Sequence, residues 1–482
     1  MKNLVLLIPI IVLLFCQCAD FDLNKTNNSG SLRFSADTVS FDTVFTTIGS
    51  TTKQLKVKNP NSGEVNISSI HLANEHSFFR INVDGEIGDA ISNVSIQPND
   101  SVFIFIEVTI DPKSNNNPVF IEDSIIFEME GKRHGIKLHA YRQDVTILKN
   151  DTLETTTWSG KPYLLLGDVW IKEGSTLTIE KGTTIYCHDA RDTVTLNVFG
   201  NIIVNGTTDE PVVFRGDRLD EVWEGYKYDK VSGQWGGVII FPSDQKSSFS
   251  NCVIRNAING LYIGDFTSDI RAEVDLNNVV VHNSLNYGLF AINAKMNLLN
   301  CQITNSGVFN FIIAAGGKYN VYHSTIANYY GLDYKATRLD NACFALTNAI
   351  QYSNDYYAVN DLEEANFYNC IVDGEYENEM AFQLVPDYAF NFKFDHCLLK
   401  VNESITTDFP DHFISCYFNE DSLFQSIEKW NYDFQLDSLS FAIDKGDAAI
   451  ETKYPGLKFD LNGNERFDGK PDLGAYEFVK EN

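Results

Sequence analysis

The sequence predicts an all-β protein in which a β-sandwich is followed by a right-handed parallel β-helix with a C-terminal cap. The main observation is a six-residue phrase. Its first position is Asn or His, its second is often Cys, its third and fourth are mostly apolar, its fifth varies and its sixth is often Asn. It begins at Asn251, Asn278, Asn300, His323, Asn369 and His396. The copies therefore start 27, 22, 23, 46 and 27 residues apart. Because 46 is twice 23, we expect one copy that has lost the pattern.

Each repeat unit has the length and composition of one solenoid coil. About 23 residues are too few for a helical-hairpin repeat of over thirty residues. Its centre, such as Cys252-Val253-Ile254, is rich in residues that favour strands. Coils of this kind stack strands at a spacing of about 4.8 Å into parallel sheets. The repeat thus predicts a rod with long, flat faces, which suits extended polymers.

Four cysteines share the second position of the phrase: Cys252, Cys301, Cys370 and Cys397. We expect them to form an inward ladder of buried free thiols. Cys252 and Cys301 would lie two rungs apart, about 9 to 10 Å, which exceeds the ~7 Å Cα limit for a disulfide. Zinc is not expected, because the chain has no Cys-x-x-Cys pair with a nearby His pair.

Composition limits the partners. The chain of 482 residues has 65 acidic and 37 basic residues, giving a net charge of −28. Such a charge repels phosphate backbones, and no basic cluster offsets it, so nucleic acid is not an expected partner. A soluble, surface-exposed monomer accounts for the same acidity.

The N-terminus predicts a lipid anchor. Residues 1–18 comprise a basic start, an apolar run over 4–15 and Cys16-Gln17-Cys18, a run too short for a stable membrane span. The segment resembles the signal peptides of bacterial lipoproteins. That resemblance implies lipidation of Cys18, with Cys16 as the alternative, and an ordinary cleaved signal is the other interpretation. The acidic residues after Cys18 resemble the surface-export signal of Bacteroidetes lipoproteins.

A polar tether is expected at 19–31. Together with the lipid it would hold the folded protein at the outer membrane, exposed at the cell surface, without a transmembrane helix.

Separate alternating strands and turn signals predict a sandwich at 32–143. The stretch 102–110 alternates apolar and polar residues over nine positions, and Asn59-Pro60 and Gln97-Pro98 open turns. The stretch contains no cysteine. It resembles the immunoglobulin-like modules that precede larger domains in bacterial surface proteins, which implies a spacer or contact role.

The β-helix is expected at 144–435. The strings 174–185 and 196–206, and then Trp235-Gly236-Gly237, resemble the opening coils of bacterial right-handed parallel β-helix proteins. That group includes pectate lyases, polygalacturonases, other glycan lyases and adhesins. The resemblance therefore implies a fold and leaves the activity open.

Enzyme signatures are weak. A polygalacturonase-like site needs paired aspartates and a Gly-His-Gly turn, and the chain has no Gly-His-Gly. A lyase-like site needs a positioned base; the solenoid's scattered candidates are Arg255, Arg271, Arg338 and Lys295. His282 and His323 fall within the phrase and are expected to be turn or stacking residues.

We therefore expect a noncatalytic scaffold or adhesin that binds glycans or another surface component. The alternative is a polysaccharide lyase or glycoside hydrolase acting in a β-helix groove.

Two non-repeating stretches, 217–230 and 331–364, carry aromatic and polar residues suited to sugar stacking. The candidate glycan contacts are Trp223, Tyr226, Tyr334, Arg338 and Tyr356. The simpler interpretation is that these aromatics pack each excursion onto the rod.

The C-terminal residues 436–482 are expected to cap the β-helix. The strings 440–447, 460–466 and 472–477 resemble the ending of many bacterial surface β-helix proteins, including relatives of polymorphic outer membrane proteins. Asp460, Asn462 and Asn464 alternate as calcium ligands do, but the EF-hand spacing fails because its twelfth position is Pro471. Calcium and turn-forming side chains are the two alternatives; no other cofactor is expected.

Overall fold

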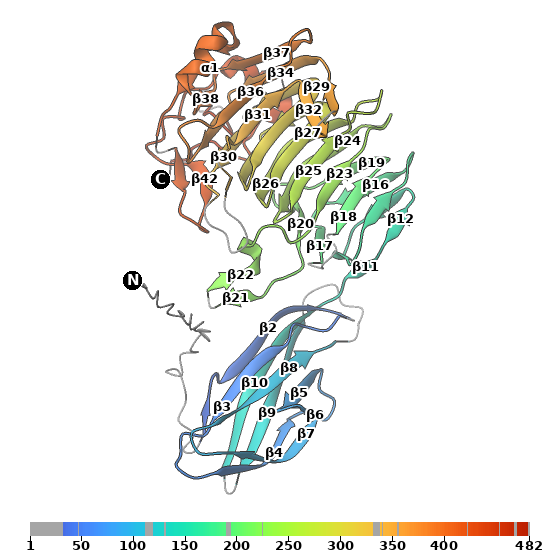
Figure 1. Ribbon diagram of the computed structural model, residues 1–482, viewed down its shortest axis with the longest axis vertical. Coiled ribbons are helices and arrows are strands. Elements are labelled where there is room, and N and C mark those ends of the chain that lie inside the picture. The colour runs from blue at the N-terminus through green and yellow to red at the C-terminus, as the bar shows by residue number, and fades with distance from the viewer. Residues whose placement is uncertain are drawn as a thin grey trace, which may run out of the picture. The chain divides into compact units, whose positions relative to one another are not determined.

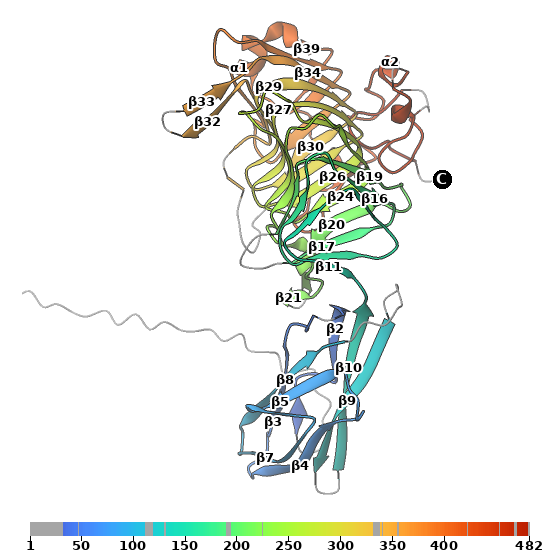
Figure 2. The ribbon, with the colours of Figure 1, turned by 90° about the vertical axis from the view of Figure 1, so that its right-hand side faces the viewer.

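The computed structural model confirms the all-β fold class (Figures 1 and 2). It describes residues 32–46, 48–110, 119–129, 132–188, 194–223, 225–330, 338–339, 341–353, 356–421, 423–452, 454–466 and 470–480. The chain divides into two compact units, Met1–Asp144 and Val145–Asn482, which are described separately. The predicted signal peptide and tether, residues 1–31, lie outside the described residues.

The first unit is a sandwich of two five-stranded sheets. One sheet has the order β1 (Arg33–Phe34), β3 (Lys53–Lys58), β8 (Ser101–Val108), β5 (Phe79–Val83), β6 (Glu86–Gly88). The other has the order β2 (Thr38–Phe45), β10 (Lys132–Gln143), β9 (Val119–Met129), β4 (Val65–Leu72), β7 (Ala90–Ile96). Strand β8 alternates buried and exposed residues, as its sequence predicts, and places Ile104 and Ile106 in the core.

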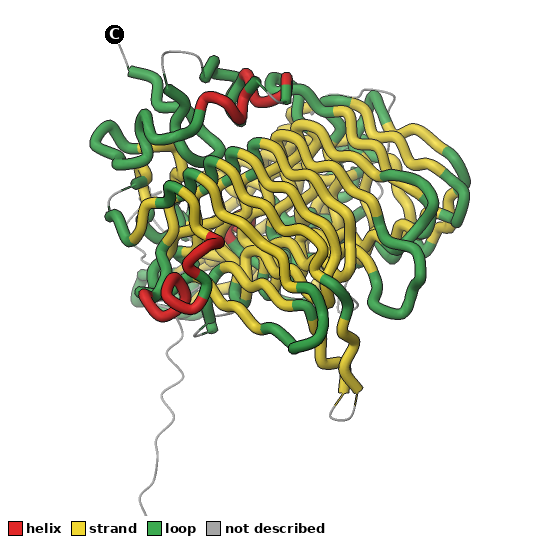
Figure 3. Tube along the Cα trace, turned by 90° about the horizontal axis from the view of Figure 1, so that it is seen from above, coloured by secondary structure: helices red, strands yellow, loops and turns green. Residues whose placement is uncertain are grey.

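The second unit is a parallel β-helix whose coils contribute strands to three faces, seen as stacked rungs in Figure 3. The first face contains β11 (Thr146–Leu148), β14 (Tyr163–Leu165), β17 (Thr184–Cys187), β20 (Val212–Gly216), the second halves of β24 (Ser247–Arg255) and β26 (Glu273–Ser284), β28 (Gln302–Ser306), β30 (Thr325–Asn328), β35 (Ile371–Gly374), β38 (Leu398–Leu399) and β40 (Tyr417–Phe418).

The other two faces complete each coil. The second face contains β12 (Asp151–Leu153), β15 (Val169–Ile171), β18 (Thr195–Val198), β23 (Gly237–Ile240), β25 (Asn259–Gly264), the first halves of β27 (Tyr287–Leu299) and β29 (Phe309–Tyr322), β31 (Phe344–Thr347) and β36 (Met380–Gln383). The third face contains β13 (Thr156–Trp158), β16 (Thr176–Glu180), β19 (Asn201–Asn205), the first halves of β24 and β26, the second halves of β27 and β29, β34 (Leu362–Tyr368), β37 (Phe390–Asp395) and β39 (Phe413–Ile414).

The first residue of the phrase bends the chain from the third face to the first. Asn251, Asn278 and Asn300 have φ values of 47°, 55° and 51°, in the left-handed region that Asn tolerates better than most residues. Their side chains also form a ladder: Asn278 Nδ2 donates to Asn251 Oδ1, and Asn300 Nδ2 to Asn278 Oδ1, both at 3.1 Å. Asparagine recurs at this position because it satisfies the bend and the stack together.

The expectation of a lost repeat copy is wrong. Thr325 pairs directly with Ile371, so the copies that begin at His323 and Asn369 occupy neighbouring rungs. The additional residues between them form excursions, including the hairpin of β32 (Ala349–Ser353) and β33 (Tyr356–Val359). Spacing alone cannot distinguish a degenerate coil from an insertion within one coil.

The thiol ladder is confirmed. Cys252, Cys301, Cys370 and Cys397 are free and buried, and Val279 separates the first two in the register. Cys416, for which the sequence showed no pattern, continues the ladder, because Leu398 pairs with Tyr417 and so sets Cys397 beside Cys416.

Helix α1 (Glu403–Asp408) and η2 (Pro410–His412) lie against the core inside the last coils, where Ile405 and Phe409 pack on it and His412 stacks on Phe392. The remaining elements pack on the outside of the coils: β21 (Glu221–Trp223), β22 (Tyr226–Lys227), η1 (Tyr228–Lys230), β41 (Phe424–Ser426), β42 (Asp433–Leu436), α2 (Ala448–Glu451) and η3 (Pro455–Lys458). Among the described residues, no helix has the length and hydropathy to span a membrane.

The C-terminal residues lie along the flank of the coils and not over the last rung, where a cap is expected. Ala475 N donates to Thr325 Oγ1 at 3.0 Å, and Tyr476 Oη donates to Gln302 Oε1 at 2.5 Å. Leu473 packs with Ala327, Ile371 and Leu398 on the outer side of the first face. These outward residues are apolar, and burying them favours the position on the flank.

Candidate functional site

A row of polar side chains follows the outside of the first face. Tyr186 pairs with Arg215, whose neighbour on the next rung is Arg255. Arg255 pairs with His282, and His282 with Thr304. Tyr186, Arg215, Arg255 and His282 are half-buried, so each keeps part of its side chain exposed. Neighbouring rungs are about 4.8 Å apart, which brings these groups together although they are distant in the sequence.

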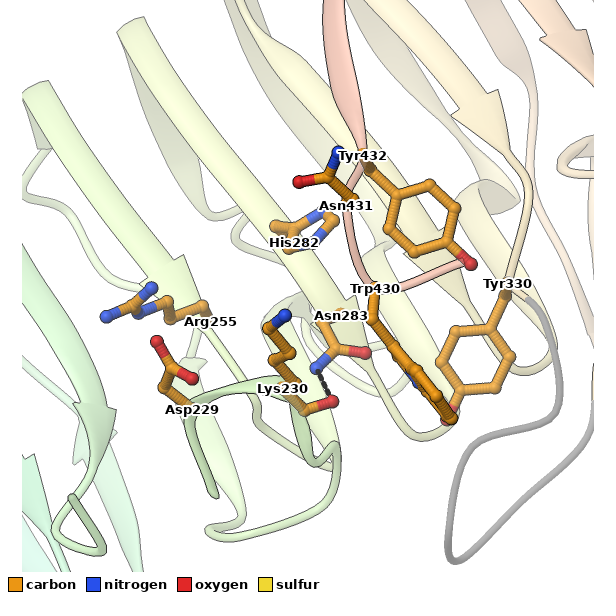
Figure 4. A pocket seen from close by; sticks show the side chains of 9 residues that line it. All are labelled: Asp229, Lys230, Arg255, His282, Asn283, Tyr330, Trp430, Asn431 and Tyr432. Atoms are coloured by element: carbon orange, nitrogen blue, oxygen red, sulfur yellow. Dashed lines mark hydrogen bonds between the residues drawn. The ribbon is translucent and has the colours of Figure 1, made fainter. Parts of the chain in front are cut away.

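A cavity of about 290 Å³ lies over this row (Figure 4). It is lined by Asp229, Lys230, Arg255, His282, Asn283, Tyr330, Trp430, Asn431 and Tyr432. Figure 4 shows Arg255 and Asp229 at one end, and the rings of Tyr330, Trp430 and Tyr432 gathered at the other. We call this space the row cavity.

Hydrogen bonds fix the walls of the row cavity to its floor. Asn283 Nδ2 donates to the carbonyl oxygen of Lys230 at 3.1 Å, and Asn256 Nδ2 donates to that of Asp229 at 2.7 Å. The ring centroids of Trp430 and Tyr226 are 4.7 Å apart. The excursion 221–230 and the loop before β42 are thereby held against the first face.

The row cavity is cationic within a strongly acidic chain. Among the described residues that line it, Lys230 and Arg255 outnumber the one carboxylate, Asp229. Within the described residues, Lys230 has no ion-pair partner and Arg255 Nε has no hydrogen-bond partner. Burial, followed by the charge of Arg255, lowers the pKa of Arg215. These cations have unused capacity to bind an anion.

His282 is neutral at physiological pH. Burial and the nearby Arg255 lower its pKa to about 4. Its Nδ1 lies 2.9 Å from Thr304 Oγ1, and within the described part of the chain its Nε2 makes no hydrogen bond. In the tautomer whose Nδ1–H donates to Thr304, Nε2 is free to accept a proton or a hydrogen bond; in the other tautomer Nε2 is a donor.

A second cavity, of about 540 Å³, lies further along the first face and shares Tyr432 with the row cavity. Four carboxylates line it together with two lysines: Asp373, Glu375, Glu420, Asp421, Lys400 and Lys429. Tyr329 Oη donates a short hydrogen bond to Asp373, and Lys400 Nζ lies 3.7 Å from the same carboxylate. Burial raises the pKa of Asp373. Among the described residues, no cluster of three His, Cys, Asp or Glu side chains could hold a metal ion.

Two of the predicted glycan contacts, Tyr226 and Arg338, have described side chains, and both are buried. Tyr226 is buried against Trp430. Arg338 is also buried and forms an ion pair with Glu379. Their positions agree with the simpler interpretation, that these side chains pack the excursions. The residue Tyr334 and the side chains of Trp223 and Tyr356 lie outside the description.

The other sequence candidates occupy different places. Of the possible bases, Arg255 lines the row cavity, whereas Arg271 and Lys295 form ion pairs with Glu363 and Glu273, at 2.8 and 2.9 Å, away from it.

The possible calcium ligands form a turn. Asp460 Oδ1 accepts the backbone N–H of Asn462 and Asn464, at 2.9 and 2.6 Å. Asp460 Oδ2 accepts Asn464 Nδ2 and the N–H of Glu477, at 3.1 and 2.8 Å. Each of the two oxygens accepts two hydrogen bonds, so this carboxylate stabilises the turn, as expected of a turn-forming side chain.

Sequence reasoning missed Asp229, Lys230, Arg215, Trp430 and Tyr432 as site residues. The register contains a signal for the floor: Arg255, His282 and Thr304 all occupy the fifth position of the phrase, which points outward on the first face. The walls come from non-repeating segments, whose sequences contain no comparable pattern.

Comparison with known proteins agrees with the fold. The model of the pectate-lyase-like β-helix domain family matches residues 148–251, less than half of the chain. No curated protein sequence matches. Similar solved structures include a family 123 glycoside hydrolase from Clostridium perfringens, 12% identical over 24% of this chain and 26% of that chain, with a TM-score of 0.17.

Two further structures have comparably low scores. A protein of unknown function from Porphyromonas gingivalis W83 is 12% identical over 26% of this chain and 61% of that chain, with a TM-score of 0.18. The ASH/PapD-like domain of human CEP192 is 9% identical over 30% and 96%, with a TM-score of 0.17. The chain thus spans about a quarter of the hydrolase, and at these scores none of the three supports an argument about function.

Proposed function

We propose that the β-helix binds an acidic polysaccharide in the row cavity and that the protein serves as a noncatalytic surface scaffold or adhesin. The observation that carries the proposal is the half-buried pair Lys230 and Arg255, which lines the cavity beside the rings of Trp430 and Tyr432, with Arg215 on the rung next to Arg255. Guanidinium and ammonium groups bind carboxylates or sulfates, and aromatic rings stack on sugar faces.

The acidic surface does not prevent this binding. Repulsion between the chain's net negative charge and a polyanion is largely screened beyond about 10 Å at 0.1 M salt. The charged residues that line the row cavity in the described part of the chain are Lys230, Arg255 and Asp229, an excess of one positive charge. Short-range attraction therefore exceeds long-range repulsion for a ligand that enters the cavity.

The remainder of the chain fits a surface protein in this proposal. A lipid on Cys18, or on Cys16, anchors it to the outer membrane. Residues 19–31 tether the folded part, and the sandwich acts as a spacer that holds the β-helix off the surface. These roles rest on the sequence pattern of the N-terminus and on the resemblance to bacterial surface lipoproteins.

A glycan array that contains acidic and neutral polysaccharides tests the proposal, followed by calorimetry with the purified protein. We expect acidic glycans to bind. Arg255→Gln should weaken binding about 10- to 150-fold, since a hydrogen bond to a charged group contributes about 1.5 to 3 kcal/mol. Lys318→Gln is the matched control, because Lys318 is exposed on the third face and paired with Glu364. A preference for neutral glycans, or equal affinity of both variants, would refute the proposal.

The second candidate function is a polysaccharide lyase, favoured by the neutral imidazole of His282 beside Arg255. In such a reaction Arg255 would neutralise a uronate carboxylate and His282 would remove the proton from the adjacent carbon, C5. The glycosidic C4–O bond would then break as the C4=C5 double bond forms, and the leaving oxygen would take a proton from water. Hydrolysis by two carboxylates is less well supported, because Asp229 is the only acid among the described residues that line the row cavity. Incubation with any bound uronan, monitored by the absorbance of the unsaturated product, separates binding from lysis. Loss of turnover in His282→Ala with binding retained would indicate the enzyme.

A further inference from the structure

The row on the first face is interrupted directly after the cavity. Arg215, Arg255 and His282 are partly exposed, but the next two outward residues, Thr304 and Ala327, are each 0% exposed. From this we infer that the row cavity is a blind groove that takes the end of an acidic glycan chain rather than its interior. This inference rests on the proposed function and specifies the form of the ligand.

Aromatic side chains form the closed end. Phe434, on β42, packs with Ala327 in one apolar cluster, and its ring centroid lies 6.3 Å from that of His282. Tyr432 contacts His282 at the same distance. Its hydroxyl donates to the carbonyl oxygen of Tyr329 at 2.6 Å, which fixes it to the coil that carries Ala327. The closed end is therefore attached to the rod and is not a loose loop.

The closed end is too wide for a polysaccharide to pass along this face. Two covered rungs correspond to about 10 Å along the rod. A sugar chain following the rungs would have to replace the side chains buried over Thr304 and Ala327. The volume agrees, since about 290 Å³ lies at the lower limit of the roughly 300 to 1,000 Å³ typical of ligand cavities. Such a space accommodates a terminal portion of a chain.

The charge beyond the closed end is a second, independent argument. Where the outward row continues, at Asp373 and Lys400, the cavity is lined by four carboxylates and two lysines. A polyanion held by Arg255 would meet repulsion there. The two cavities are therefore not one continuous groove for one acidic polymer.

Stoichiometry tests this inference. The purified full-length protein is titrated with oligogalacturonates and hyaluronan fragments of defined length, from short oligomers to long chains, in a calorimeter. We expect one protein bound per chain at every length, and an affinity per chain that stops rising after the first few sugars. Two end-blocked forms of each oligomer are then compared: one whose reducing end is reduced to an alditol, and one with an unsaturated residue at the non-reducing end. One of the two blocks, the one at the end that enters the cavity, should decrease the affinity at least tenfold.

The outcomes separate the two proposals. Protein bound in proportion to chain length, with no effect of either end block, overturns end recognition while leaving acidic-glycan binding intact. No binding of either glycan, or one protein per chain with Arg255→Gln as tight as wild type, overturns the proposed site itself. Lys318→Gln again serves as the control variant for folding and non-specific charge effects.

Discussion

Replacing Arg338 by Met is expected to destabilise the β-helix by about 3 to 5 kcal/mol, because it leaves a buried carboxylate without its cation. The side chains of Arg338 and Glu379 are 2% and 0% exposed. Arg338 Nη1 donates to Glu379 Oε1 at 2.9 Å, and Nη2 donates a short bond to Oε2. The pair connects the end of the excursion that follows β30 to the coil before β36.

The remaining contacts of the pair place the expected loss near the lower limit, about 3 kcal/mol. Glu379 keeps hydrogen bonds from the N–H of Cys343 and Tyr376, at 2.8 and 2.9 Å. The variant also removes the guanidinium donors from the carbonyl oxygens of Asn328 and Asn341, each at 2.9 Å, although that of Asn328 still accepts the N–H of Glu375 at 3.0 Å. The double variant Arg338→Met, Glu379→Gln removes the buried charge and should recover most of the loss.

Urea titration measures the change through the midpoint of the β-helix transition. Lys318→Met is the control: it breaks an exposed pair with Glu364 and should change stability by at most about 1 kcal/mol. Burial raises the pKa of Glu379, which Arg338 opposes. Without Arg338 the pKa of Glu379 in the folded protein rises further. The loss of stability in Arg338→Met is therefore complete at pH values above this raised pKa, and it diminishes as the pH falls through it and Glu379 becomes protonated. A midpoint for Arg338→Met equal to that of Lys318→Met would refute the argument.

Three further predictions concern the anchor, the thiols and the site. Replacing both Cys16 and Cys18 with Ser should move the protein from the membrane fraction to the soluble fraction, and unchanged membrane retention would rule the anchor out. Cys301→Ser should destabilise by about 1 kcal/mol in urea titration, because it puts a hydroxyl in the core with the carbonyl oxygen of Leu299 as its nearest acceptor. Native thiol labelling should reach the half-buried Cys416 before Cys301, and the reverse order would contradict the register. A bound anion should raise the pKa of His282 from about 4, so calorimetry should show affinity rising as pH falls from neutral toward about 5, and affinity independent of pH would exclude this coupling.

The fold could be predicted because one local signal repeats. In each phrase a left-handed Asn or His precedes an apolar strand, as at Asn251 and Asn278. Bend and strand are both local properties, so they are visible without the structure. The same logic failed at the interval of 46 residues, because an insertion within one coil and a lost coil have the same length in sequence.

The site could be predicted only in part. Its floor follows from the fifth position of the phrase, since Arg255 and His282 must stack once their coils are in register. Its walls could not be predicted, because Lys230 and Trp430 come from segments 200 residues apart that meet only through tertiary packing. Arg338 illustrates the opposite error: a charged residue in a polar excursion is expected to be exposed, but this one is buried with Glu379, 41 residues later in the chain.

Removing residues 458–482 should expose the flank of the β-helix rather than its end. Arg466, 0% exposed, donates to Glu477 at 3.0 Å and to Asn300 Oδ1 at 3.1 Å, while Leu473 covers Ile371. Burying a side chain such as Leu contributes about 1.5 to 3 kcal/mol, so the truncated protein should have a lower urea midpoint and should self-associate. Hydrogen exchange locates the effect: amides of β28, β30 and β35 should lose protection, while those of the terminal rung, β39 and β40, keep theirs. Loss of protection confined to β39 and β40 would instead show that the segment closes the rod.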